Sequence, residues 1–277
     1  MNVEMASTLE PVAGLVASAS RKPPTDVWVV RLYGDSLALP RHTDGIPFNA
    51  TFAELFCAWL RSEAGIGSVS LYNRSQGGGT APQLARLGTE DTSYFGHATP
   101  QLLILQCGIC DCAPRPIPLG LRRFIGRLPG CLQRPVIGLL HRHRPWLQRH
   151  GCVWRHTEAE PFRQAVTTWI RESAEFARAV FVVNITPPTQ AGEAHSPGLV
   201  AGVEEYNQLL QTSVAFVGSD KVVLVDVHAA LLASSGALAR CINQTDGHHL
   251  TVAGHEFYFA MLKKHFLALP SQASAAT

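Results

Sequence analysis

Five short, mainly apolar runs recur along the chain, and segments with the spacing of amphipathic helices separate most of them. Continuous apolar runs of this kind are typical of strands that are buried on both faces. Their alternation with helices predicts βαβ units, right-handed crossovers and a parallel sheet. We therefore expect an α/β fold, a three-layer α/β/α sandwich around a five-stranded parallel sheet. The predicted strands are 27–33, 68–72, 101–106, 180–185 and 222–227, and the predicted helices are 52–62, 161–178, 203–217 and 254–267.

One domain is expected to cover residues 26–270, after a loose arm at 1–25 that is rich in Ala, Ser and Pro. The chain has no stretch of about eighteen apolar residues, so no membrane-spanning helix is expected. The N-terminus lacks the basic lead and apolar segment of a secretory signal, which favours a cytoplasmic location. The odd number of cysteines, seven, fits free thiols in a reducing compartment.

Two distant stretches carry the residues of a serine triad. Ser36 follows the first apolar run, and Asp246 and His249 lie three residues apart near the C-terminus. A serine hydroxyl becomes a good nucleophile when an imidazole accepts its proton and a carboxylate orients that imidazole. The short spacing allows one loop to place Asp246 behind the ring of His249. Two structural interpretations compete with catalysis: Ser36 as a helix N-cap, and Asp246 as the first residue of an Asx turn before Gly247.

The sequence motifs around these residues resemble the conserved blocks of the SGNH/GDSL hydrolase family, and the resemblance runs from about residue 27 to about residue 267. The resemblance implies a flavodoxin-like SGNH hydrolase fold. It also implies a serine hydrolase that attacks carboxylic esters through an acyl-enzyme, often an acetyl or acyl ester of a carbohydrate, without metal or cofactor. The matching blocks are Gly34-Asp35-Ser36-Leu37, the glycine-rich run 73–80, Gly108-Ile109-Cys110-Asp111, 184–188, Glu205-Tyr206-Asn207 and 246–251.

The resemblance assigns catalytic roles to three residues. Ser36 corresponds to the nucleophile, His249 to the general base and Asp246 to the carboxylate that orients the base. His248 is the alternative base, because it stands next to His249 in the sequence. We choose His249 because it occupies the histidine position of the family motif Asp-x-x-His-Leu.

The resemblance also implies three donors for the oxyanion of the tetrahedral intermediate. They are the backbone N–H of Ser36, the backbone N–H of a glycine in the second block, and an asparagine side chain in the third block. Gly78 is our choice for the glycine, with Gly77 and Gly79 one position away. The alternative for this glycine-rich run is an ordinary flexible turn.

The third block departs from the family at Cys110, which stands where the asparagine is expected. A thiol is a weak hydrogen-bond donor, and the loss of one oxyanion donor typically costs a factor of about 100 to 1,000 in rate. Cys107, Cys110 and Cys112 also raise the possibility of a zinc site. Because a structural zinc needs four ligands and no second Cys-x-x-Cys occurs, we predict buried thiols and no metal.

A basic insertion is expected at about 115–157, between the third and fourth strands. Residues 112–157 contain nine arginines, four histidines and no acidic residue. Three interpretations remain open: a solvated surface, a lid that binds an anionic substrate through Arg115, Arg122 and Arg123, and attachment to an anionic membrane surface. No nucleic-acid motif accompanies the charge, so no nucleic-acid partner is expected. Pro129, Pro135 and Pro145 predict two or three short helices.

The functional prediction is therefore an esterase acting on a small-molecule or glycan ester, and the basic insertion adds an anionic substrate to the candidates. An O-acyltransferase on a glycan is an alternative, because the same acyl-enzyme can pass its acyl group to a sugar hydroxyl. A catalytically weak member that binds a glycan or a partner protein is another, and Cys110 favours it. The sequence leaves the oligomeric state open.

Overall fold

The computed structural model describes residues 27–64, 66, 68–95 and 101–269, so the predicted arm at 1–25 lies outside the described residues. Five parallel strands form one sheet in the order β2-β1-β3-β4-β5, which confirms the predicted sheet. This is the strand order of flavodoxin-like folds. The strands are β1 (Val27–Gly34), β2 (Ser68–Asn73), β3 (Gln101–Gln106), β4 (Ala179–Val183) and β5 (Val222–Val225).

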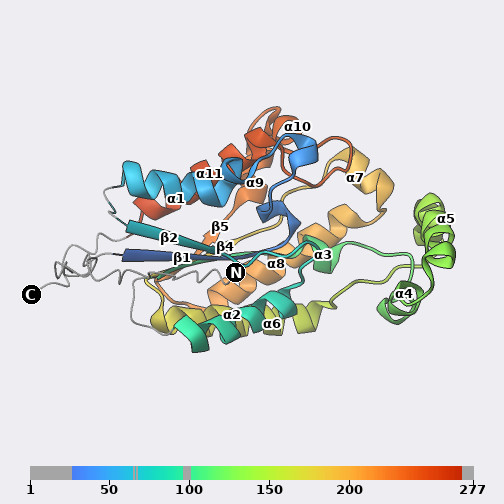
Figure 1. Ribbon diagram of the computed structural model, residues 1–277, viewed down its shortest axis with the longest axis horizontal. Coiled ribbons are helices and arrows are strands. Elements are labelled where there is room, and N and C mark those ends of the chain that lie inside the picture. The colour runs from blue at the N-terminus through green and yellow to red at the C-terminus, as the bar shows by residue number, and fades with distance from the viewer. Residues whose placement is uncertain (1–26, 65, 67, 96–100, 270–277) are drawn as a thin grey trace, which may run out of the picture.

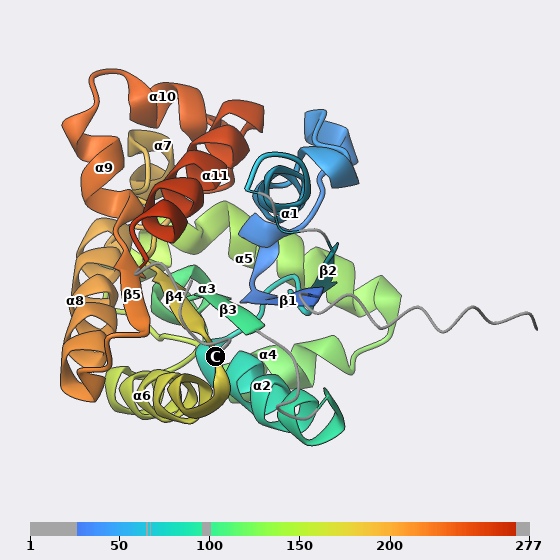
Figure 2. The same cartoon turned by 90° about the vertical axis from the view of Figure 1, so that its left-hand side faces the viewer.

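Helices cover both faces of the sheet, as the view along the strands in Figure 2 shows. One face carries α1 (Phe52–Ser62) and α11 (Val252–Leu267), and the other carries α2 (Ala81–Phe95), α6 (Ala159–Phe176) and α8 (Leu199–Val217). Strand β4 is buried over its whole length, and the apolar side chains of β3 from Leu102 to Leu105 are buried as well, because helices cover both faces of the sheet. The shorter elements are η1 (Ser36–Ala38), η2 (His42–Asp44), η3 (Phe48–Ala50), α3 (Ile109–Cys112), α7 (Gln190–His195), α9 (Val227–Ala233) and α10 (Ala237–Cys241).

Helix α2 was absent from the sequence prediction. Its sequence is mildly amphipathic and contains Gly88, which disfavours a helix interior. The structure shows why a glycine stands there: a Cβ on Gly88 would lie 2.1 Å from Nε1 of Trp169 in α6. The close approach of these two helices therefore requires a residue that lowers the helical propensity.

The insertion contains α4 (Leu119–Gly126) and α5 (Gly130–Arg149), which lie beyond α3 and α7 at one end of the molecule (Figure 1). The prediction that Pro135 and Pro145 break this segment is wrong, since both lie inside α5. A proline removes one backbone hydrogen bond and can bend a helix without ending it. Pro129 does precede a helix start, as the N-cap of α5. No helix in the described part of the chain is long and apolar enough to cross a bilayer.

The strand order places a topological switch point between β1 and β3. From β1 the chain moves outward to β2 and then returns to the other side of β1, where Gly34 pairs with Gln106. Ligands of open α/β sheets bind in the crevice at the carboxyl ends of such strands. Ser36 follows β1 and Cys110 follows β3, so two of the predicted site residues lie at this crevice.

Candidate active site

Ser36 begins the short helix η1 directly after β1. Asp35 is the N-cap of this helix, and its Oδ1 accepts a hydrogen bond from the backbone N–H of Leu37 at 2.9 Å. The backbone N–H of Asp35 donates to the carbonyl oxygen and to the side-chain oxygen of Gln106 in β3, both at 3.2 Å. The residue before the serine is thus tied to two neighbouring elements, which positions the serine at the end of the sheet.

The loop between α10 and α11 presents the other two predicted triad residues. Oδ1 of Asp246 accepts the backbone N–H groups of His248 at 3.1 Å and His249 at 3.0 Å. Gly247 has φ +79°, and a Cβ there would lie 2.2 Å from the backbone nitrogen of Gly192 in α7. Asp246 is therefore an Asx-turn residue, as the structural interpretation expected, and its Oδ2 remains available to a side chain.

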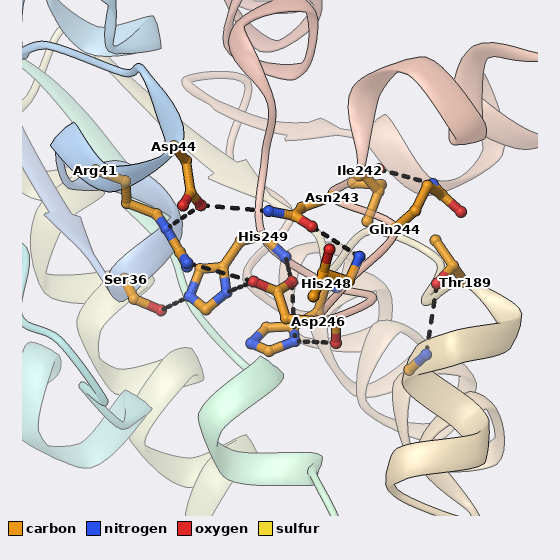
Figure 3. A network of polar contacts seen from close by, with 12 residues as sticks. Ser36, Arg41, Asp44, Thr189, Ile242, Asn243, Gln244, Asp246, His248 and His249 are labelled. Atoms are coloured by element: carbon orange, nitrogen blue, oxygen red, sulfur yellow. Dashed lines mark hydrogen bonds and ion pairs between the residues drawn. The ribbon is translucent and has the colours of Figure 1, made fainter.

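A chain of hydrogen-bonding contacts joins the three residues, as Figure 3 shows. Nε2 of His249 lies 3.0 Å from Oγ of Ser36, and Nδ1 of His249 lies 2.9 Å from Oδ2 of Asp246. The contact with the carboxylate favours the tautomer in which Nδ1 carries the proton. Nε2 is then free to accept the proton of the serine hydroxyl, which is the geometry of a nucleophile, base and orienting carboxylate.

His248 lies beside this chain. Its Nδ1 is 3.0 Å from the backbone carbonyl oxygen of Asp246, and its ring centroid lies 4.1 Å from that of His249. Among the described residues, His249 is the histidine whose ring nitrogen contacts Ser36. The geometry therefore supports the choice of His249 over His248 as the base.

The electrostatics of the site keep the imidazole neutral and the carboxylate ionised. Burial, together with the neighbouring His248, lowers the pKa of His249 to about 4, against the opposing effect of Asp246. Burial alone would raise the pKa of Asp246, but the backbone N–H donors of His249 and His248 outweigh it and the pKa is lowered. At neutral pH the imidazole can therefore accept a proton.

Arg41 is a site residue that sequence reasoning missed. Its Nη2 donates to Oδ2 of Asp246 at 3.3 Å, and its Nε pairs with Asp44 at 2.8 Å. Asn243 donates to the same carboxylate of Asp44 at 3.3 Å. This network, drawn in Figure 3, holds the loop that carries Asp246 against the segment that follows Ser36.

Backbone N–H groups are available to stabilise an oxyanion. Those of Ser36, Gly77 and Gly78 donate to no acceptor in the part of the chain that the structure describes. Gly78 has φ +75°, a conformation that favours glycine, whereas the N–H of Gly79 is already bonded to the carbonyl of Gln76 at 2.9 Å. These observations favour Gly78 over Gly79 as the second donor.

Cys110, at the predicted third donor position, lies in the first turn of α3 and is 9% exposed. Burial and the nearby carboxylates of Asp35 and Asp111 raise the pKa of its thiol, so the group stays neutral. Asp111 itself is buried, and both of its carboxylate oxygens lie 3.1 Å from the backbone nitrogen of Ala81 at the start of α2. The third block therefore anchors the helix that follows the glycine-rich run.

The three cysteines of the third block, which the sequence analysis weighed as zinc ligands and predicted to be buried thiols, lie in the interior. Cys107 and Cys112 are buried like Cys110, and burial raises the pKa of both thiols. Within the described ranges, the one group of three metal-ligating side chains close together is Asp246, His248 and His249, with one ligand atom from each within 4.8 Å. The guanidinium of Arg41 beside Asp246 opposes a cation there. The group is therefore best explained as part of the hydrogen-bonded chain.

The three candidate substrate-binding arginines separate in the structure. Arg115 and Arg122 line one cavity, together with Arg144, which the sequence did not single out. Arg123, next to Arg122 on α4, is exposed and does not line that cavity. The difference follows from the helical direction of neighbouring side chains, which the sequence alone did not resolve.

Asp35 gives the fold a testable dependence on pH. Burial raises the pKa of its carboxyl to about 7, against the opposing hydrogen bond from Leu37. Because this value exceeds the unfolded value of about 3.9, the contribution of Asp35 to stability is fully present below about pH 4 and is lost as the pH rises towards 7. Asp35→Asn removes this loss, so the variant is expected to exceed wild type above pH 7 by about 2–4 kcal/mol in the free energy of unfolding.

Urea unfolding of both proteins between pH 4 and pH 8 measures this difference. Asp220→Asn, at an exposed position, controls for the change of net charge. A difference between Asp35→Asn and wild type that is the same at every pH would contradict the assignment.

Comparisons with known proteins identify solved structures that share this fold. No protein-family model matches the sequence, and no curated protein matches it. Among solved structures, the lipase/acylhydrolase from Enterococcus faecalis is 16% identical, with 87% of this chain and 95% of that chain covered at a TM-score of 0.58. A member of the lipolytic protein G-D-S-L family from Veillonella parvula is 14% identical, with 87% and 100% covered at 0.53. Axe2, an acetylxylan esterase from Geobacillus stearothermophilus, is 14% identical, with 85% and 92% covered at 0.54. The chain therefore has the fold of the SGNH/GDSL hydrolases.

Proposed function

We propose that the protein is a serine esterase that hydrolyses carboxylic esters through an acyl-enzyme. The observation that carries the proposal is the contact chain from Ser36 to His249 at 3.0 Å and from His249 to Asp246 at 2.9 Å. It is assembled from opposite ends of the chain, at the crevice where ligands of this fold class bind. The similarity in fold to several ester hydrolases is consistent with this reaction.

In the first half-reaction, Oγ of Ser36 attacks the carbonyl carbon of the ester while Nε2 of His249 accepts the hydroxyl proton. The backbone N–H groups of Ser36 and Gly78 donate to the oxyanion that forms. His249 then gives its proton to the leaving alcohol, and the acyl group remains on Ser36. Asp246 stays ionised and stabilises the imidazolium in between.

In the second half-reaction, a water molecule attacks the acyl-enzyme as His249 accepts one of its protons. Collapse of the second tetrahedral intermediate releases the carboxylic acid and returns the proton to Ser36. A sugar hydroxyl in place of the water would give an acylated sugar. The hydrolase and the O-acyltransferase thus share every residue named so far and differ in the acceptor that reaches the acyl-enzyme.

The proposed substrate class is an acyl ester of a carbohydrate, with acetyl as the first group to test. Two solved structures with this fold are described as acetylxylan esterases, Axe2 and AlAXEase. The direct test measures acetate release from acetylated xylo-oligosaccharides and from 4-nitrophenyl acetate, with and without an unacylated sugar as acceptor. Release of acetate supports the esterase, acylated acceptor supports the transferase, and no turnover of any ester by folded protein would contradict the proposal.

Cys110→Asn is expected to raise kcat on simple esters, because an amide restores the donor that the thiol supplies poorly. The gain is expected to reach up to about a hundredfold, somewhat less than the usual cost of losing an oxyanion donor. Cys110→Ala is the matched control and should leave the rate nearly unchanged. A Cys110→Asn rate equal to that of the control would show that another group already serves the oxyanion.

A further inference from the structure

The strongest unexplained feature of the molecule is a cavity of about 330 Å³ inside the basic insertion. Its walls come from the segment after α3 and from α4 and α5, the helices that lie at the far end of the molecule in Figure 1. Arg115, Arg122 and Arg144 line it, with His141 beside them. Apolar side chains, among them Ile125 and Ile137, supply the remainder of the wall.

The three arginines form no ion pair with a carboxylate of the described residues, and the segment 112–157 contains no Asp or Glu. The nearest acidic influence is that of Asp111, whose charge acts on Arg115 without an ion pair between them. Arg155 of the same segment differs, since it forms a two-pronged pair with Glu205 at 2.8 and 2.6 Å. Glu205 thus neutralises Arg155, whereas Arg115, Arg122 and Arg144 bring positive charge into one cavity without an ion-pair partner among the described residues.

Gathering these charges in a partly buried cavity is electrostatically unfavourable. Burial, with the neighbouring Arg122, lowers the pKa of Arg115, and burial with the charges of Arg115 and Arg122 lowers that of Arg144 to about 10. The Nε atoms of Arg115 and Arg144 are buried without a hydrogen-bond partner among the described residues. Buried donors of this kind are normally satisfied, so a group that accepts hydrogen bonds and carries negative charge would offset the cost.

Helix α7 connects the cavity with the proposed catalytic site. Nη2 of Arg144, which lines the cavity, donates to Oγ of Ser196 directly after α7 at 2.8 Å. The same helix contacts the loop that carries Asp246, since a Cβ on Gly247 would lie 2.2 Å from the backbone nitrogen of Gly192. The cavity and the ester site therefore share α7 as a neighbour.

We infer that this cavity is a phosphate subsite, which binds a phosphate group carried by the ester substrate. Three guanidinium groups exceed the charge of one carboxylate, whereas a phosphate ester carries about −1.5 to −2 and offers three acceptor oxygens. A guanidinium group can donate two parallel hydrogen bonds to a pair of phosphate oxygens. The inference rests on the proposed function for its link to an ester, and it narrows the substrate to an acylated sugar phosphate or a related phosphorylated alcohol.

Calorimetric titration of the full chain with inorganic phosphate, at constant ionic strength, tests the subsite without requiring turnover. Wild type should bind phosphate, and Arg122→Gln should weaken binding at least about tenfold by removing a charge-assisted contact. Arg122 is exposed enough for the variant to fold, and Arg123→Gln is the matched control, with the same charge change on the same helix outside the cavity. The control should bind as wild type does.

Kinetics then test the link to the substrate. Arg122→Gln should lower kcat/KM about tenfold for an acetylated sugar phosphate and leave it unchanged for the same acetylated sugar without phosphate. Equal loss on both esters, or equal weakening of phosphate binding by the two variants, would overturn the inference. Binding to anionic lipid vesicles without binding of inorganic phosphate would overturn it too and favour a membrane-facing role. Phosphate binding through Arg122 in a protein that hydrolyses no ester would retain the subsite and remove the esterase proposal.

Discussion

Ser36→Ala is expected to lower kcat for ester hydrolysis by a factor of about 10⁶, with little change in the stability of the fold. The side chain lost is a single hydroxyl, whose contact in the described residues is Nε2 of His249 at 3.0 Å. No acyl-enzyme can form without it, so binding and oxyanion donors alone remain. The residual rate should still exceed the rate of uncatalysed hydrolysis in water, because the oxyanion donors are unchanged.

The measurement is steady-state hydrolysis of 4-nitrophenyl acetate beside a thermal unfolding curve of each protein. Similar melting with the loss of turnover assigns the effect to chemistry. A variant that retains more than about a hundredth of wild-type kcat would contradict Ser36 as the nucleophile, since that loss is typical of removing a single supporting donor.

His249→Ala is expected to lower kcat nearly as far, by a factor of about 10⁵ to 10⁶. Its Nε2 is the proton acceptor for Ser36, and its Nδ1 links the site to Asp246 at 2.9 Å. Residues that act as one unit give losses that do not add. Ser36→Ala combined with His249→Ala should therefore be about as slow as either single variant.

His248→Ala is the control that the chain itself offers, one residue away. Its Nδ1 contacts a backbone carbonyl oxygen, so the variant loses about one ordinary hydrogen bond and should cost less than about tenfold in kcat. Measuring the two variants on the same ester separates the histidines. Equal losses at both positions would contradict the assignment of His249 as the base.

Much of the fold was predictable, because buried parallel strands have an unbroken apolar sequence that few other elements share. The predicted strands and the observed ones agree to within about two residues at their ends, which is the usual uncertainty of element boundaries. Helix α2 was missed because Gly88 lowers the helical propensity of its segment. The glycine is required by the close approach of Trp169, which is far away in the sequence. The continuity of α5 through Pro135 and Pro145 was missed because proline usually ends or bends a helix, and the sequence did not show that this helix continues past both.

The candidate site was also predictable only in part. The sequence blocks predicted Ser36, Asp246 and His249, because each block follows or precedes an element whose end lies at the crevice. Arg41 could not be predicted, since its contact with Asp246 spans 205 positions and no local pattern marks it. The cavity arginines were predicted only in part: Arg115 and Arg122 line it, Arg123 does not, and Arg144 was overlooked. Which face of a helix meets a cavity depends on packing that one sequence did not specify.

The central claim is that Ser36 is an activated nucleophile, and intact-mass spectrometry after treatment with a fluorophosphonate tests it most directly. The probe reacts with a serine whose hydroxyl proton a neighbouring base accepts during the attack. We expect one adduct on the wild-type protein and none on Ser36→Ala, with the chain folded in both cases. An unlabelled wild-type protein, or an adduct that persists in Ser36→Ala, would contradict the account.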